Sequence, residues 1–235
     1  QRQFHSRMRR LPGQVVRLAR LSVLLLWVVF PFLWAITCSL RPIDKLFTLT
    51  PEWLPSPLTL DNYLWAIHEP NFVIPLRNSF LVSGLTAVIS VTLGALAAYG
   101  LARLRYPGKK TIITIMLSTQ MLPTMLVIIP IFLIYARVGL FNTLSGLILA
   151  STAWTLPYAV LLLRSFFSGL SVSLEEQAMV DGCGRLGAFM RITLPLSIAG
   201  IIAVTVYVFI WTWGDMLFPF LLAKSLVVSI ANLPQ

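Results

Sequence analysis

The sequence is poor in charged residues. Only 11% of its 235 residues are Asp, Glu, Lys or Arg, against about 25% in soluble domains, while 57% are hydrophobic. This composition predicts an integral membrane protein. The net charge of +10 would suggest nucleic acid in a soluble protein, but here the basic residues lie beside long apolar runs, where they act as orientation signals. We therefore expect contact with membrane lipid and no contact with nucleic acid.

Residues that build metal, redox and catalytic sites are also scarce. The two cysteines, Cys38 and Cys183, fall on opposite sides of the membrane in the topology predicted below, so no disulfide is expected. The two histidines, His5 and His68, are likewise separated and cannot share a metal ion. The chain has no phosphate-binding loop, no Gly-Xaa-Ser-Xaa-Gly elbow and no paired carboxylates within a span. These absences predict a chain that is no enzyme and binds no metal or cofactor.

Long apolar runs dominate the remainder and predict an all-α polytopic membrane protein, because about 20 apolar residues cross the hydrocarbon core as a helix. The prolines at 123 and 130 are expected to kink the third run without ending it. A basic tail over 1–20 precedes the first run, and a proline-rich outer loop over 41–75 follows it, with one short helix over 61–67 capped by Asp61. The five predicted spans are 21–40, 76–101, 111–135, 144–167 and 198–222.

The distribution of basic residues predicts the orientation of these spans. A cytoplasmic N-terminus places thirteen of the 18 basic residues in the cytoplasm, six of them in the tail and four over 103–110, with Arg164, Arg185 and Arg191 as the other three. Because cytoplasmic loops carry the excess of Lys and Arg, this orientation is favoured over its inverse. The loop over 168–197 is then cytoplasmic.

That loop contains the most polar segment of the chain. Five ionisable residues lie within it, and leaving all five unpaired at the bilayer centre would cost on the order of 12–17 kcal/mol. The segment must therefore lie in water or against another protein, or else rest on lipid headgroups as an amphipathic loop. These residues are Glu175, Glu176, Asp181, Arg185 and Arg191.

Local signals predict a helix–turn–helix in this loop. Ser173 and Glu176 have the spacing of a capping box, which predicts a helix beginning at Leu174. Gly182 and Gly184 are expected to end that helix. A second short helix is predicted over 185–193, before the chain returns to the membrane at Pro195. Such an element between two spans is typical of a docking surface.

One acid, Asp215, is predicted to lie inside a span. An intramembrane acid is a candidate functional residue, here for a gate or for the lining of a pathway. The alternative is a hydrated acid near the end of its helix, since about 25 Å of helix separates it from the cytoplasmic side. Trp211 and Trp213 similarly fit either a pathway surface or interfacial anchors.

The polar loop also carries a family resemblance. Glu176-Gln-Ala178, three residues, Gly182, nine residues and Ile192-Thr-Leu194-Pro195 resemble the signature of ABC-importer permeases, which reads Glu-Ala-Ala, three residues, Gly, nine residues, Ile-Xaa-Leu-Pro. The only departure is Gln177 in place of the first alanine. Further stretches are similar to the carbohydrate-importer branch that contains the second maltose-transporter permease. They include 59–63, 78–80, 98–103 and 213–215, and the resemblance extends over about residues 20–222.

The resemblance implies a type I ABC-importer permease fold and a complex with several partners. These are a second, homologous permease subunit, two cytoplasmic ATPase subunits that hold ATP and Mg, and an extracytoplasmic solute-binding protein. The expected substrate is a carbohydrate, a disaccharide, oligosaccharide or sugar derivative. The loop is expected to dock its first helix into the ATPase, with Ala178 and Gly182 on one close-packing face and Glu175 and Glu176 meeting basic partner residues. The implied coupling residues are Leu174, Glu175, Glu176, Ala178, Met179, Asp181 and Gly182, with Ser173, Gly184, Ile192, Leu194 and Pro195 shaping the loop.

Other interpretations stay open from the sequence. Relatives of this branch have a sixth span, so the tail over 223–235 is expected to be truncated. A peptide or amino-acid importer and a membrane scaffold that moves no solute are the alternatives. A secondary transporter is disfavoured, because the spans contain little charge and no inverted repeat is visible.

Overall fold

The computed structural model describes residues 11–46, 53 and 56–223, and within these ranges the chain is helix and loop without a strand. The predicted all-α fold is therefore confirmed. Three of the described helices are long and apolar enough to cross a membrane. Two further pairs of helices, each bent at a short break, would bring the number of spans to five if each pair is one span. The chain divides into two packed units, 1–70 and 71–235. The start of the predicted basic tail and the predicted outer tail from residue 224 lie outside the described residues.

The first unit contains one long helix and a loop that folds against its end. Helix α2 (Leu11–Ser39) begins earlier than the predicted span, and a 3-10 turn η1 (Ile43–Lys45) and helix α3 (Asp61–His68) follow. The Asn62 side-chain amide donates to the carbonyls of Ser39 and Arg41, at 3.0 and 2.6 Å. These bonds attach α3 to the end of α2.

The prediction that Asp61 caps α3 is wrong. Leu60 occupies the N-cap position and no side chain bonds there. The Asp61 backbone N–H instead donates to the Thr59 hydroxyl at 3.1 Å. The Thr59 hydroxyl thus accepts one of the N–H groups that have no helical partner at the start of α3.

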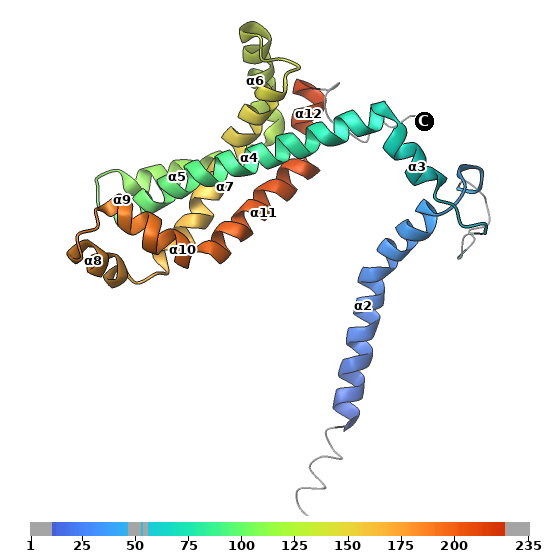
Figure 1. Ribbon diagram of the computed structural model, residues 1–235, viewed down its shortest axis with the longest axis horizontal. Helices are drawn as coiled ribbons and strands as arrows, with labels where there is room; N and C mark the ends of the chain where they lie inside the picture. Colours follow the sequence, from blue (N-terminus) through green and yellow to red (C-terminus); the bar gives the residue numbers. More distant parts are fainter. Residues whose placement is uncertain (1–10, 47–52, 54–55, 224–235) are drawn as a thin grey trace, which may run out of the picture. The chain divides into compact units, whose positions relative to one another are not determined.

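In the second unit, three long helices pack around small residues and hydroxyl groups. They are α4 (Pro70–Arg103), α7 (Leu144–Ser168) and α11 (Ile198–Gly214), all labelled in Figure 1. Gly94 on α4 lies so close to α7 that an added Cβ would be 3.1 Å from the Ala159 Cβ. The Ser90 and Thr155 hydroxyls bond at 2.8 Å across the same interface. Lipid is as apolar as leucine, so close van der Waals contact and interhelical hydrogen bonds hold these helices together.

The third predicted span is two helices with a sharp bend, which corrects the expectation of one kinked helix. Helices α5 (Lys109–Thr119) and α6 (Thr124–Val138) meet at 94°. Pro123 has an extended backbone, with ψ at 125°, and it offers no N–H to continue α5. Pro130 remains inside α6, as predicted. The chain therefore tolerates one proline within a helix and uses the other to begin a new one.

The last predicted span is also interrupted. Helix α11 ends at Gly214, and the short helix α12 (Leu217–Leu222) follows after Asp215 and Met216. The Asp215 carboxylate accepts the backbone N–H groups of Leu217 and Phe218, each at 3.2 Å. Because this carboxylate satisfies donors that a continuous helix would pair internally, the break is stabilised. The predicted continuous helix over 198–222 is therefore wrong.

The second unit contains two clusters of buried hydrophobic residues. One lies toward the end of α4 and contains Leu101, Phe167 and Phe189. The other contains Val82, Leu147 and Phe218, where α12 packs against α6 and α7. The first cluster directly supports the polar loop between α7 and α11.

Candidate functional site

The polar loop folds into four consecutive helical pieces over residues 172–196, which we call the coupling loop. Helix α8 (Val172–Val180) is followed by α9 (Arg185–Ala188), the π-helical segment η2 (Phe189–Thr193) and α10 (Leu194–Leu196). The π segment ends two residues before Pro195, which has no N–H to donate to the carbonyl four residues before it. The predicted second helix is thus present and extends through the proline.

The start of α8 differs from the prediction. Ser171 is the N-cap residue, the helix begins at Val172, and no side chain caps it. Ser173 lies inside the first turn, where its hydroxyl contacts that of Ser171 at 2.7 Å. The predicted capping box between Ser173 and Glu176 is therefore wrong, because the extended backbone of Ser171 starts the helix earlier.

The end of α8 at Gly182 is confirmed. Gly182 has φ of +90°, a conformation that side-chain-bearing residues rarely adopt. The Cys183 N–H donates to the Ala178 carbonyl at 2.9 Å, and the Gly182 N–H to that of Met179 at 3.2 Å. This pair of bonds is a Schellman motif. Gly182 consequently lies beyond the helix, which corrects the expectation that it shares a helical face with Ala178. Gly184 was expected to help end α8 but is instead the N-cap residue of α9.

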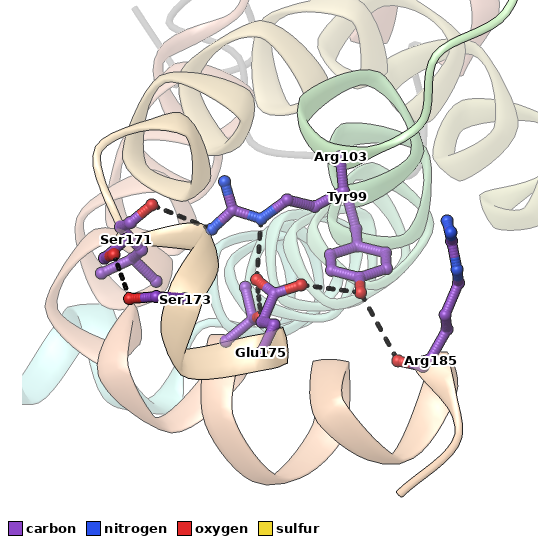
Figure 2. A network of polar contacts seen from close by, with 8 residues as sticks. Tyr99, Arg103, Ser171, Ser173, Glu175 and Arg185 are labelled. Atoms are coloured by element: carbon purple, nitrogen blue, oxygen red, sulfur yellow. Dashed lines mark hydrogen bonds and ion pairs between the residues drawn. The ribbon is translucent and has the colours of Figure 1, made fainter. Parts of the chain in front are cut away.

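Glu175 stands at the centre of a buried polar network (Figure 2). Its Oε1 atom accepts from Arg103 Nε and from the Thr193 hydroxyl, both at 2.7 Å, and its Oε2 atom accepts from the Tyr99 hydroxyl at 2.9 Å. Arg103 also donates from Nη2 to the Leu170 carbonyl at 3.1 Å. Glu175 is only 4% exposed and Thr193 is fully buried. We call these four side chains, Tyr99, Arg103, Glu175 and Thr193, the Glu175 node.

The node keeps Glu175 ionised despite its burial. Burial alone would raise the pKa of the Glu175 carboxyl, but the hydrogen bonds from Thr193, Arg103 and Tyr99 outweigh it and hold this pKa below its ordinary value of 4.5. The carboxylate is therefore charged and paired at neutral pH. Breaking such a pair by removing one partner leaves an uncompensated buried charge, which costs about 3–5 kcal/mol.

The node ties three parts of the chain together. Tyr99 and Arg103 lie on the last turns of α4, Glu175 lies on α8, and Thr193 lies on the π segment. The expectation that Glu175 meets a basic residue of a partner is therefore wrong, because its carboxylate is taken up within this chain. Glu176 and Asp181, by contrast, are exposed.

Several apolar side chains of the coupling loop are exposed. Val180 is 87% exposed, although it lies in a segment too polar for the membrane interior. Apolar side chains beside exposed acids suit a protein partner better than water. The other large apolar side chains exposed in the coupling loop are Val172, Leu174, Met179, Leu186, Met190 and Leu196.

The residues expected to shape the loop occupy different environments. Ile192 and Leu194 are half-buried, and Leu194 packs against the cluster that contains Phe167. Pro195 and Gly184 are exposed. Ala178 is half-buried on α8 and also supplies a carbonyl to the Schellman motif.

Of the three residues proposed for a pathway, Trp213 and Asp215 line one small recess, and Trp211 packs elsewhere. Trp211 stacks near Trp154, with ring centroids 6.4 Å apart, in the cluster that contains Phe218. Trp213 is 40% exposed and contacts Phe80 edge-on at 4.6 Å. Asp215 lies at the break before α12, where it bonds to the backbone in addition to any contact with water.

Sequence reasoning missed three of the four side chains of the node. The sequence indicates Arg103 as an orientation signal and places it with Tyr99 in the resembling stretch 98–103, but it gives none of Tyr99, Arg103 and Thr193 a role beside Glu175. The available signal was the spacing of Tyr99 and Arg103, four residues apart on one helical face at the end of a span. That spacing places both groups beside the loop but does not say which acid they meet.

Comparison with known proteins identifies relatives over most of the chain. Residues 90–232 match the family described as binding-protein-dependent transport system inner membrane component. The chain is 37% identical over 208 residues to the inner membrane ABC transporter permease protein YcjP of Escherichia coli, covering 87% of this chain and 74% of that protein. It is 36% identical over 205 residues to the trehalose transport system permease protein SugB of Mycobacterium tuberculosis, covering 87% and 73%.

A third relative and a solved structure agree with this match. The chain is 32% identical over 215 residues to the trehalose/maltose transport system permease protein MalG of Thermococcus litoralis, covering 86% of this chain and 75% of that protein. In the crystal structure of a bacterial ABC transporter involved in the import of the acidic polysaccharide alginate, one chain is similar with a TM-score of 0.76 and 20% identity. The match covers 94% of this chain and 76% of that one. This likeness shows the fold.

Proposed function

This chain belongs to the family of binding-protein-dependent transport system inner membrane components, and from that premise we propose that it is a permease subunit for ATP-driven carbohydrate uptake. The observation that carries the proposal is the similarity, at more than 30% identity, to permeases named for trehalose and for trehalose and maltose. The peptide and amino-acid alternative has no counterpart among the relatives described above. The membership itself confirms the resemblance found in the sequence.

The coupling loop is the proposed point of contact with the ATPase. Its exposed apolar surface and the exposed carboxylates of Glu176 and Asp181 offer a partner both apolar area and charge. ATP and Mg would be held by two ATPase subunits, and this chain would supply the docking surface and part of the solute pathway. Its N-terminus would then be cytoplasmic, as the basic residues predict.

The Glu175 node connects the proposed ATPase contact to the membrane helices, so that a movement of the loop can be transmitted to them. When the ATPase subunits close on ATP, a displaced α8 would carry Glu175 with it, and the node would transfer that displacement to α4 and to the π segment that leads into α11. Packed elements respond to such a force as rigid bodies. A second permease subunit, identical or different, would complete the pathway, and an extracytoplasmic binding protein would deliver the solute.

Reconstitution of the complete importer tests this proposal against a membrane scaffold. Vesicles would contain this chain, its partner permease and the ATPase subunits, and the binding protein would be added outside with trehalose, maltose or diacetylchitobiose. We expect sugar-loaded binding protein to stimulate ATP hydrolysis and to drive sugar into the vesicles. Hydrolysis without stimulation and without uptake, in a complex shown to contain every subunit, would support the scaffold and overturn the proposal.

A further inference from the structure

A small polar recess lies at the end of the helix bundle away from the coupling loop. It is formed by α4, α7, α11 and the break before α12, and it is of a size for one water molecule or one hydroxyl group. Thr212 is the fifteenth residue of α11 and lies about 21 Å from the start of that helix, which is beside the coupling loop. The polar and aromatic residues that line the recess are Ser79, Ser83, Ser151, Thr212, Trp213 and Asp215.

One residue that lines the recess has a buried hydroxyl group with no hydrogen-bond partner among the residues that the structure describes. Thr212 is only 6% exposed, and its Oγ1 atom makes no hydrogen bond among the described residues. Buried polar groups are nearly always satisfied by protein, water or ligand, so an unsatisfied one requires an explanation. The carboxylate of Asp215 retains accepting capacity, because each of its oxygens has two lone pairs and accepts one backbone N–H. The recess therefore holds both a hydroxyl and a carboxylate able to bond to an added group.

An exposed aromatic surface borders this recess. Trp213 lines the recess itself and remains 40% exposed. Its ring stacks on that of Phe209 with centroids 5.8 Å apart, and Phe80 meets it edge-on at 4.6 Å, so its position is fixed by neighbours from two helices. Trp211 is half-buried and packs against the cluster that contains Phe218, so Trp213 is the more accessible of the two tryptophans.

We propose that Trp213 and the recess together form a sugar-binding subsite of this subunit. The apolar face of a pyranose ring would lie against Trp213, and one hydroxyl of the ring would enter the recess to donate to Asp215 and bond to Thr212. Sugars combine apolar ring faces with hydroxyl groups, and a pocket that joins an aromatic surface to a few placed polar groups matches both features. A lipid chain or an apolar helix of the partner permease would leave Thr212 unsatisfied. The subsite rests on the proposed carbohydrate transport.

The test measures sugar uptake by the complete importer with single substitutions in this chain. Thr212→Val removes the unpartnered hydroxyl with little change of shape, and Trp213→Leu removes the aromatic surface, while Trp213→Phe retains part of it. Thr205→Val is the matched control for threonine, because the Thr205 hydroxyl bonds to the Ile201 carbonyl of its own helix at 2.8 Å. Trp27→Leu is the control for loss of an exposed tryptophan. The probes are radiolabelled trehalose, maltose and diacetylchitobiose, each with sugar-loaded binding protein.

We expect Thr212→Val and Trp213→Leu to lower sugar taken up per ATP hydrolysed by about threefold to tenfold, the range of a lost hydrogen bond or ring contact. Trp213→Phe should lie between Trp213→Leu and the wild type, and both controls should match the wild type. Unchanged uptake per ATP in both variants would overturn the subsite. So would a parallel loss of hydrolysis and uptake in a complex with reduced assembly, since that result marks a packing role. If the wild-type complex takes up none of the sugars, the proposed function fails, and the subsite fails with it.

Discussion

At the scale of single residues, two adjacent glutamates have opposite surroundings. Glu175 is buried against Arg103, Thr193 and Tyr99, while Glu176 is exposed on the next position of α8. The sequence shows that both acids lie in a polar loop, but only the fold shows which of them points inward. A side chain's partner in another helix depends on packing that local spacing does not encode.

Neutralising the two glutamates should therefore have different effects, on stability for Glu175 and on ATPase association for Glu176. Glu175→Gln leaves Arg103 without its buried partner, so we expect a loss of stability of about 3–5 kcal/mol. The measurement is the midpoint of thermal unfolding of the purified complex, which should fall for Glu175→Gln. Glu176→Gln should leave that midpoint unchanged but weaken ATPase association, which pull-down of the ATPase subunits would measure. Equal midpoints for the two variants would contradict the conclusion that Glu175 holds α8 to α4 through the Glu175 node.

The same residue predicts a pH dependence. The folded-state pKa of Glu175 is lowered, so its contribution to stability is fully present above its unfolded-state pKa near 4.5 and is lost as pH falls through the lower folded value. We expect the wild type to lose more stability than Glu175→Gln on acidification below pH 4.5, because the variant has no carboxylate to protonate. Thermal unfolding at each pH measures this difference. An equal loss of stability in both proteins would show that other ionisable groups determine the acid sensitivity.

At the scale of elements, the end of helix α8 was predicted correctly from a glycine, and its start was predicted wrongly from a serine. The end of α8 was predictable because Gly182 offers the left-handed turn that a helix end uses. The start was not, because Ser171 and Ser173 both suit an N-cap and only the backbone decides between them. Likewise Pro123 and Pro130 look alike in sequence, yet only Pro123 begins a new helix.

Gly182 allows a sharp test of the α8 geometry. Gly182→Val places a β-branched side chain at a φ of +90°, which costs at least about 1–2 kcal/mol and disfavours the Schellman bonds. We expect sugar uptake per ATP hydrolysed to fall by at least about twofold while hydrolysis persists. Gly184→Ala is the matched control, since Gly184 has an ordinary φ of −69° and an added Cβ meets nothing within 4 Å. Intact coupling in Gly182→Val would show that the turn is not needed.

At the scale of the whole molecule, the low share of charged residues predicts a membrane protein, and the long apolar runs predict that it is helical. The number of apolar runs and the family signature were also visible, because both depend on residue types and not on packing. The bend of 94° between α5 and α6 and the break at Asp215 were not, since each depends on backbone groups being satisfied elsewhere in the fold. The Glu175 node and the recess join residues far apart in the chain, and no local pattern predicts such contacts.

The natural cysteines allow a test of the predicted orientation. Cys38→Ala leaves Cys183, on the turn after α8, as the single thiol, and Cys183→Ala leaves Cys38 near the end of α2. We expect a membrane-impermeant maleimide to label Cys183 only in inside-out vesicles and Cys38 only in right-side-out vesicles. The labelling would use vesicles that contain the permeases without ATPase, so that nothing covers the loop. Labelling of Cys183 from the outside would invert the topology.

The Glu175 node has a consequence for assembly itself. Because its bonds lie wholly within this chain, the loop that we propose as the ATPase docking surface is ordered before the two proteins meet. Association then sacrifices little conformational entropy, and most of the contact energy is available as affinity. We expect the permease and the ATPase to join as two preformed shapes, with an assembly rate governed by collision and charge and not by folding of the loop.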